Sequence, residues 1–167
     1  MGVHEHKASG KRRVRCAVVT VSDTRTPETD SSGARIRELV HAAGHEVISH
    51  RIIPDDPAII REVVRLLAAD STVEAVLLTG GTGVGPRDQT FETVRPMLDK
   101  EIEGFGELFR MLSYQEIGSA AMLSRAIGGT IAGKVLFSMP GSTAAVELAV
   151  AKLILPELGH VLHLLKS

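Results

Sequence analysis

The sequence predicts an α/β protein, a three-layer α/β/α sandwich built on a mainly parallel sheet. Short apolar runs alternate along the chain with segments in which apolar residues recur every three or four positions, the patterns of buried strands and amphipathic helices. Glycine clusters follow two of the apolar runs, where strand-to-helix turns belong. With 44% hydrophobic and 23% charged residues, the chain can bury a core large enough for one domain.

Residues 1–13 are expected to form a flexible basic arm, and residues 14–167 a single domain. The positive charges of the arm are not interleaved with aromatic residues, so a solvated tail is favoured over a nucleic-acid-binding arm. The apolar run that follows reaches Asp23 without a signal-peptide cleavage site, and no uncharged stretch is long enough to span a membrane. A cytoplasmic protein without membrane association is therefore expected.

Charge and residue usage argue against several function classes. The 19 Lys and Arg residues are balanced by 20 Asp and Glu residues, so no bulk attraction to nucleic acid or to a membrane surface is expected. Aromatic residues make up only 3% of the chain, too few to build base-stacking platforms. The single cysteine, Cys16, excludes an internal disulfide and a multi-cysteine zinc site, and it is expected in the core.

The first half of the chain predicts two strand–helix units and a third strand. Strands are expected over residues 14–21, 46–53 and 75–78. Ser31 or Ser32 is expected to cap the first helix, which Gly44 ends. Asp56 followed by Pro57 predicts the start of the second helix, because these residues favour the cap and the first turn.

The second half predicts helices to about residue 126, a glycine-rich turn over 128–134, a strand over 135–137 and a C-terminal helical region that Pro156 kinks or restarts. The turn matches the spacing of a P-loop, but Val135 replaces the hydroxyl residue that should hold Mg²⁺, and the motif precedes a strand. It is therefore interpreted as a turn only.

Polar loops follow four expected strands at one edge of the sheet, where open α/β sheets bind ligands. They contain Ser22 with Asp23, Asp55 with Asp56, the run Gly80 to Gly83, and Gly141 with Ser142. Bare backbone amides in glycine turns can approach an anion closely, so a phosphorylated ligand is expected. Tight turns without a ligand are the alternative, which two clusters at one edge disfavour.

Two acidic residues, Asp55 and Asp88, fall beside the expected anion site. A carboxylate repels a phosphate unless Mg²⁺ stands between them, so the pair indicates nucleotide chemistry. Each acid also has a structural alternative, since Asp55 could cap a helix with Asp56, and Asp88 could pair with Arg87 or cap a helix near Thr90. The residue pattern leaves both alternatives open.

The run Thr79-Gly-Gly-Thr-Gly83, followed by Arg87-Asp-Gln-Thr90, resembles the TGGTG…RDxT signature of the molybdopterin-binding MogA/MoaB family. The resemblance extends from residue 14 to about residue 165. It implies the family's α/β/α fold and homo-oligomers built from threefold units, trimers or hexamers. It also implies an ATP- and Mg²⁺-dependent adenylylation of molybdopterin that prepares it for molybdate insertion, with the insertion protein of that pathway as an expected partner.

The resemblance assigns roles to individual residues. Asp88 and Asp55 are the implied catalytic acids, which hold Mg²⁺ through the nucleotide phosphates. The implied substrate-binding residues are Ser22, Asp23, Gly80, Gly81, Thr82, Gly83, Arg87, Thr90, Pro140, Gly141 and Ser142. The chain departs from the family pattern at Phe91 and Thr143, where active relatives usually carry proline.

Two function classes follow. In the enzyme, the terminal phosphate of molybdopterin attacks the α-phosphorus of ATP, releases pyrophosphate and leaves an AMP ester. In the alternative, the chain only binds molybdopterin or acts as a scaffold, as family members that have lost the acids do, and the presence of both acids favours the enzyme. Segments 105–122 and 148–165 hold more apolar residues than one helix face needs, so we expect subunit contacts there, with packing inside one subunit as the alternative.

Overall fold

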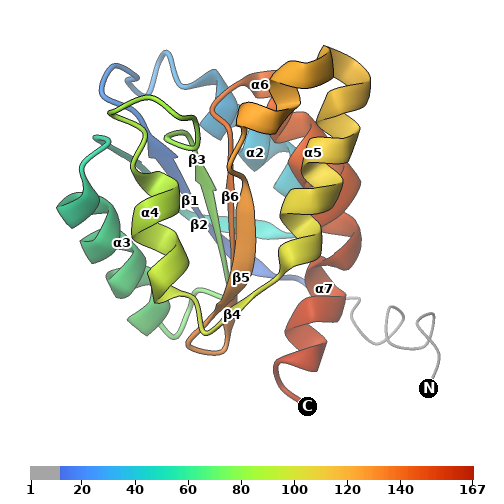
Figure 1. Ribbon diagram of the computed structural model, residues 1–167. Coiled ribbons are helices and arrows are strands. Elements are labelled where there is room, and N and C mark those ends of the chain that lie inside the picture. Colours follow the sequence, from blue (N-terminus) through green and yellow to red (C-terminus); the bar gives the residue numbers. More distant parts are fainter. Residues whose placement is uncertain (1–11) are drawn as a thin grey trace.

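The computed structural model describes residues 12–167 and has the predicted α/β/α architecture (Figure 1). The strands are β1 (Arg15–Val21), β2 (Glu46–Ile53), β3 (Ala75–Thr79), β4 (Lys100–Glu101), β5 (Ile127–Ile131) and β6 (Lys134–Met139). The helices are α2 (Ser31–Ala42), α3 (Pro57–Ala69), α4 (Thr90–Val94), α5 (Glu103–Ile117), α6 (Thr143–Glu147) and α7 (Leu155–Leu164). The 3-10 turns η1 (Arg95–Met97) and η2 (Gly118–Leu123) follow α4 and α5, and the π-helical stretch η3 (Leu148–Ile154) joins α6 to α7.

The predicted basic arm falls largely outside the described residues, so it stays a prediction. Its last two positions are described. Arg12 pairs with Glu74 at 2.7 Å, and Arg13 pairs with Glu46 at 3.4 Å. Both arginines are therefore in contact with the domain just before β1 begins.

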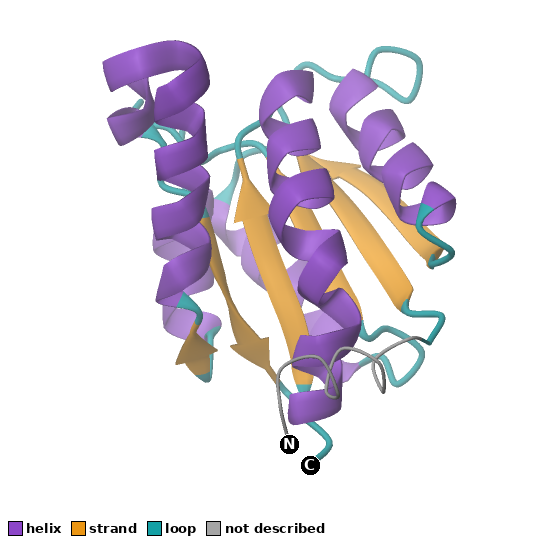
Figure 2. Ribbon diagram, turned by 90° about the vertical axis from the view of Figure 1, so that its right-hand side faces the viewer, coloured by secondary structure: helices purple, strands orange, loops and turns teal. Residues whose placement is uncertain are grey.

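The sheet has six strands in the order β2-β1-β3-β6-β5-β4. The first four are parallel, and β5 runs antiparallel to both of its neighbours. The mainly parallel sheet is therefore confirmed, with an antiparallel edge that the sequence analysis did not predict. Parallel strands place their carboxyl ends at one edge, so the loops after β1, β2, β3 and β6 meet there (Figure 2).

Helices cover both faces of the sheet, and each face has its own aliphatic core. Helices α3 and α4 pack on one face, and α2, α5, η3 and α7 pack on the other. Strand β1 shows the alternation: Cys16 and Val18 face the second group, and Ala17 and Val19 face the first. Cys16 is fully buried as expected, and its burial raises the pKa of the thiol to about 12.

The two first helices begin with aspartate caps, one of which the sequence analysis assigned wrongly. Helix α2 is capped by Asp30, whose carboxylate accepts from the Gly33 N–H at 2.9 Å. Neither Ser31 nor Ser32 is the cap, because both lie inside the first turn, and the Ser32 hydroxyl donates to the Gly141 carbonyl at 2.5 Å. Helix α3 starts as predicted, and its cap is described with the site below.

The glycine-rich stretch 128–134 is a strand and a hairpin turn, so its interpretation as a turn only was wrong. Gly128 and Gly129 lie inside β5, where a Cβ on Gly128 would come 2.7 Å from the Phe137 ring. The turn is confined to Ala132 and Gly133, which have φ of 47° and 74°. These glycines make room for neighbouring strands, a reason that turn statistics do not detect.

Lys134, the lysine of the P-loop match that the sequence analysis rejected, contacts backbone at the other end of the sheet. The Lys134 amine donates to the carbonyls of Asp70 and Val73 at 2.5 and 2.6 Å, at the edge of the sheet opposite the polar loops. Pro156 lies in the first turn of α7, where the chain restarts a regular α-helix after η3. Within residues 12–167, no helix has the length and apolar character needed to cross a membrane.

The central strands should carry most of the stability. Leu77 on β3 is fully buried, so we expect Leu77→Ala to lower the free energy of unfolding by about 3 kcal/mol, as a cavity in a packed core does. Leu66 on α3 is 50% exposed and serves as the control. Leu66→Ala should change the free energy of unfolding by less than about 1 kcal/mol. Urea unfolding measures both, and equal losses would contradict this view of the core.

Candidate functional site

Two glycine turns meet at the carboxyl edge of the sheet, one after β3 and one after β6. The Gly80 N–H donates to the Met139 carbonyl at 2.9 Å, and the Thr79 hydroxyl donates to the Pro140 carbonyl at 3.0 Å. A Cβ on Gly141 would lie 3.4 Å from the Cα of Gly80. The structure therefore brings together the two turns that the sequence analysis expected at one edge.

The glycine loop after β3 needs its glycines for conformation and for space. Gly80 and Gly81 have φ of +102° and +70°, which strain any other residue. A Cβ on Gly81 would overlap the Thr90 hydroxyl and lie 2.8 Å from Asp55 Oδ2, and one on Gly83 would lie 2.8 Å from Asp88 Oδ2. Both acids therefore lie directly against the loop.

Asp55 belongs to the site and not to a helix cap. Its neighbour Asp56 caps α3, accepting from the N–H groups of Ala58 and Ile59 at 2.9 and 3.1 Å. The Asp55 carboxylate instead accepts from the Gln89 N–H at 3.2 Å, and the residue is only 8% exposed. The capping alternative for Asp55 is thereby excluded.

The charge of Asp55 is poorly compensated. Burial raises the pKa of its carboxyl, and the nearby charges of Asp88 and Asp23 raise it further, against the opposing hydrogen bond from the Gln89 N–H. Arg87 lies nearby but pairs with Asp23, Nη2 to Oδ2 at 2.7 Å. A hydrogen bond from Arg87, and a second from the Asp55 N–H at 3.0 Å, hold the pKa of Asp23 low.

Asp88 neither pairs with Arg87 nor caps the helix near Thr90, the two structural alternatives for this residue. Its carboxylate accepts from the Gly85 N–H at 2.8 Å, so it closes the turn 85–88 and faces the glycine loop. The side chain of Arg87 is engaged with Asp23, and the residue at the cap position of α4 is Gln89, whose side chain makes no capping bond. Asp88 is therefore positioned by the loop itself.

Three more of the predicted site residues, Thr90, Ser142 and Ser22, form hydrogen bonds with backbone groups near the glycine loop. Thr90 is buried; its N–H donates to the Gly81 carbonyl at 3.1 Å, and among residues 12–167 its hydroxyl has no hydrogen-bond partner. Ser142 caps α6, accepting from the Ala145 N–H at 3.1 Å. The Ser22 hydroxyl accepts from the N–H groups of Thr24 and Arg25, so it shapes the β1 loop. These three residues hold backbone at the site.

A cavity of about 360 Å³ opens beside the glycine loop. One wall is formed by residues 80–83, Asp88 and the turn 140–142. The other wall belongs to α5 and η2 and includes Ser113, Ile117 and Leu123. The sequence analysis did not assign these three to the site; it expected subunit contacts over residues 105–122, a segment that includes Ser113 and Ile117. Asp55 does not line this cavity; it lies behind Gly81.

Two carboxylates beside the glycine loop are the donor type that a divalent cation shared with a phosphate ligand would use. Among residues 12–167, no group of three His, Cys, Asp or Glu side chains is arranged to hold a metal. Mg²⁺ commonly takes only one or two carboxylates and completes its shell with water and phosphate oxygens. The raised pKa of the Asp55 carboxyl marks negative charge for which the surrounding chain gives little compensation, as expected of such a ligand pair.

Comparison with known proteins identifies the family of this chain. A family model described as a probable molybdopterin binding domain matches residues 17–160. The chain belongs to this molybdopterin-binding family. It is 58% identical over 162 residues to molybdenum cofactor biosynthesis protein B of Bacillus cereus and 53% identical over 164 residues to that of Halalkalibacterium halodurans, each time covering 96% of the relative and at least 96% of this chain.

Solved structures of the molybdopterin-binding family share the fold. A crystal structure of molybdenum cofactor biosynthesis protein B has a TM-score of 0.91 at 58% identity and covers 93% of this chain and 97% of its own. The tungsten cofactor synthesizing protein MoaB from Pyrococcus furiosus has a TM-score of 0.83 at 36% identity over 93% of this chain and 99% of its own. The expected family and its α/β/α fold are both confirmed.

The environments of Asp55 and Asp23 predict opposite effects of pH on the stability of the metal-free protein. The raised pKa of Asp55 means that its contribution to stability is lost as pH rises through that value, so Asp55→Asn should gain stability over the wild type at neutral pH. The gain should shrink as pH falls from the raised pKa toward about 3.9, the ordinary aspartate pKa, and should vanish below it, where the carboxyl is protonated in both the folded and the unfolded state. Urea unfolding from pH 3 to 8 in the presence of a chelator measures it.

Asp23 provides the matched control with the opposite sign. Its lowered pKa means that its stabilising contribution is present at neutral pH and is lost as pH falls through the folded value. Asp23→Asn should therefore lose stability at neutral pH and approach the wild type in acid. Parallel pH profiles for the two variants would contradict the assigned electrostatics.

Proposed function

We propose that this chain binds molybdopterin at the glycine loop and transfers an adenylyl group to it from ATP. The observation that carries the proposal is the position of Asp55 and Asp88 directly against Gly81 and Gly83, so that acids and bare amides can act on the same phosphates. Binding of molybdopterin is supported by the family, and the transfer by the pair of acids.

The reaction is an exchange at phosphorus. The terminal phosphate oxygen of molybdopterin attacks the α-phosphorus of ATP, the bond to the β-phosphate oxygen breaks, and pyrophosphate leaves. Chemistry of this kind needs positioning and charge neutralisation more than a side-chain nucleophile. A bound Mg²⁺ would neutralise developing negative charge on the phosphates.

Each group of residues at the site would bind a different part of the two substrates. The amides of the glycine loop orient phosphate oxygens of the pterin ester in the cavity beside it. Asp55 and Asp88 would hold Mg²⁺ on the side where the triphosphate binds. Gly141, which lies against Gly80, would anchor the pterin phosphate with the cap residue Ser142. A second function, molybdopterin binding without catalysis, leaves the two acids unexplained.

Removal of one charge tests the enzyme. Asp88→Asn keeps the shape of the side chain, so turnover should fall at least about a hundredfold while molybdopterin binding is largely retained. Asp56→Asn is the matched control, because asparagine caps a helix as well as aspartate does and Asp56 does not touch the glycine loop. The measurement is AMP ester and pyrophosphate by mass spectrometry after incubation with molybdopterin and Mg-ATP.

The outcomes separate the two functions. Wild-type protein that binds molybdopterin and forms no AMP ester would leave only the binding or scaffolding function. An equal loss of binding and turnover in Asp88→Asn would contradict the role given to this acid. The molybdate-insertion protein as a partner and a cytoplasmic location both stay predictions.

We also propose that the chain forms a homo-oligomer through α5 and η2. The exposed apolar residues gathered there are Leu108, Met111, Tyr114, Ile117, Met122 and Leu123. In the other segment expected at an interface, 148–165, most apolar residues instead pack in the core. Ile117 and Leu123 also line the site cavity, so a second copy seated on this surface would close its outer side.

Charged residues on that surface should dissociate the oligomer. Met111→Glu with Tyr114→Glu should raise the dissociation constant at least about thirtyfold, as loss of an apolar anchor does. Leu66→Glu on α3, which is 50% exposed, is the control and should leave assembly unchanged. Sedimentation velocity measures the three proteins, and a monomeric wild type would refute the interface.

A further inference from the structure

One arginine, Arg125, holds the glycine loop from behind. Its Nε and Nη2 donate to the Gly83 carbonyl at 2.9 and 2.5 Å, and Nη2 also donates to the Asp88 carbonyl at 3.2 Å. Its backbone N–H donates to the Thr82 carbonyl at 3.1 Å. A single residue therefore binds three carbonyl groups of the segment that the proposed function places against phosphate.

These bonds fix the direction of the loop amides. In a trans peptide, the C=O and the following N–H point in opposite directions. The carbonyls of Thr82 and Gly83 point toward Arg125, so the N–H groups of Gly83 and Val84 point away from it. Arg125 lines a second cavity, of about 300 Å³, which does not include Gly83, and Gly83 lines the site cavity, which does not include Arg125.

The loop amides are available to a ligand. Across residues 12–167, no N–H group from Gly81 to Val84 donates to a protein acceptor. Successive free amides of this kind form a site for an anion only if their peptide planes are held in place. The bonds from Arg125 hold two of these planes.

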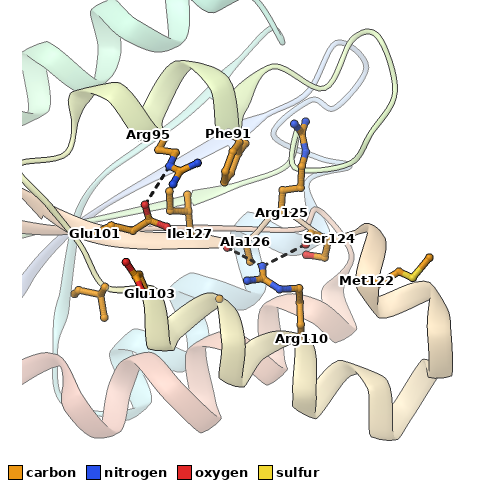
Figure 3. A pocket seen from close by; sticks show the side chains of 12 residues that line it. Phe91, Arg95, Glu101, Glu103, Arg110, Met122, Ser124, Arg125, Ala126 and Ile127 are labelled. Atoms are coloured by element: carbon orange, nitrogen blue, oxygen red, sulfur yellow. Dashed lines mark hydrogen bonds and ion pairs between the residues drawn. The ribbon is translucent and has the colours of Figure 1, made fainter.

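Arg125 is itself held through its side chain and through the backbone on either side of it, where Figure 3 shows Arg110 bonded to Ser124 and Ala126. The Arg125 guanidinium pairs with Glu92 and lies over the Phe91 ring, 5.2 Å from the centroid. The carbonyls on either side of it, those of Ser124 and Ala126, accept from Arg110 Nη1 at 3.4 and 3.2 Å. Helix α4 thus fixes the side chain, and α5 fixes the backbone from which it projects.

The second cavity is lined by Arg95 and Arg110 as well as Arg125, a set of positive charges that resembles an anion site. Arg95 pairs with Glu101 at 3.1 Å, Arg125 pairs with Glu92, and Arg110 is bound to backbone carbonyls. Each guanidinium is already engaged by protein acceptors. Support of the neighbouring loop is therefore the use of this cluster that the contacts favour.

We infer that Arg125 is a positioning residue, which holds the peptide planes of the glycine loop so that their N–H groups meet the phosphate of molybdopterin. The inference rests on the proposed function for the identity of the ligand. Lysine cannot replace it fully, because a single ammonium lacks the planar fork that reaches two carbonyls at once.

The test compares Arg125→Gln with Arg95→Gln. Both changes remove one arginine from the second cavity and from the Phe91 ring, but only Arg125 touches the loop. Arg125→Gln should raise the dissociation constant for molybdopterin about tenfold to a hundredfold, the range for lost hydrogen bonds to a charged group, and Arg95→Gln less than about threefold. Hydrogen exchange of residues 80–88 in the ligand-free proteins should quicken only in Arg125→Gln.

A chemical rescue separates positioning from general folding. In Arg125→Ala, millimolar ethylguanidinium should refill the vacated space, restore part of the molybdopterin affinity and slow loop exchange again; Arg95→Ala should show no such response. Arg125→Lys should lie between wild type and Arg125→Gln, and it serves as the test if the other variants fail to fold. Equal effects at the two arginines, or unchanged loop exchange, would overturn the inference.

The proposed function and the role of Arg125 are tested by separate measurements. If wild-type protein does not bind molybdopterin, the proposed ligand is wrong. The exchange rates of the ligand-free proteins still decide whether Arg125 positions the loop.

Discussion

The close approach of two carboxylates to bare backbone is the constraint on which the site depends. Asp55 Oδ2 lies 2.8 Å from the place that a Cβ on Gly81 would take, and Asp88 Oδ2 stands in the same relation to Gly83. The acids and the loop therefore cannot be arranged independently. Gly80 and Gly81 give the loop positive φ values, and Gly81 and Gly83 leave the space that the acids occupy.

This arrangement leaves charge where stability alone would not place it. Arg87, a cation near Asp55, pairs with Asp23 at the solvent side, and the buried Asp55 keeps a raised pKa. A chain selected only for stability would pair the buried acid first. The buried Thr90 hydroxyl, which lacks a partner among residues 12–167, lies at the same loop. Unsatisfied groups that gather at one place indicate a site completed by something outside the chain.

The sequence predicted the parts of the fold that follow from local periodicity. Strand β2 has the predicted ends, α3 starts at the predicted cap, and the polar loops meet at one edge because parallel strands end together. It failed at β5, where Gly128 makes room for the Phe137 ring of the next strand. It also failed at Asp30, because the hydroxyls that follow are equally good caps by residue type.

The sequence also predicted some residues of the candidate site and missed others. Asp55 and Asp88 were predictable because acids beside a glycine turn carry a chemical signal. The α5 wall and Arg125 were not assigned to the site, because their partners are a cavity and backbone carbonyls. The Gly83 carbonyl lies 42 residues before Arg125 in the chain, and a carbonyl is present at every position. No pattern of residue types marks which carbonyl an arginine will reach.

Phe91, at which the sequence departs from the pattern that the resemblance implies, lies in the layer that supports the glycine loop. Phe91 lines the second cavity and lies between Arg125 and Arg95, with guanidinium carbons 5.2 and 5.6 Å from its ring centroid. Proline at this position would offer no aromatic face to either arginine. Because Phe91 does not line the site cavity, the difference acts on how firmly Arg125 is held and not on the groups that meet a ligand. Variation at this position can therefore change the rigidity of the glycine loop while its acids and amides stay the same.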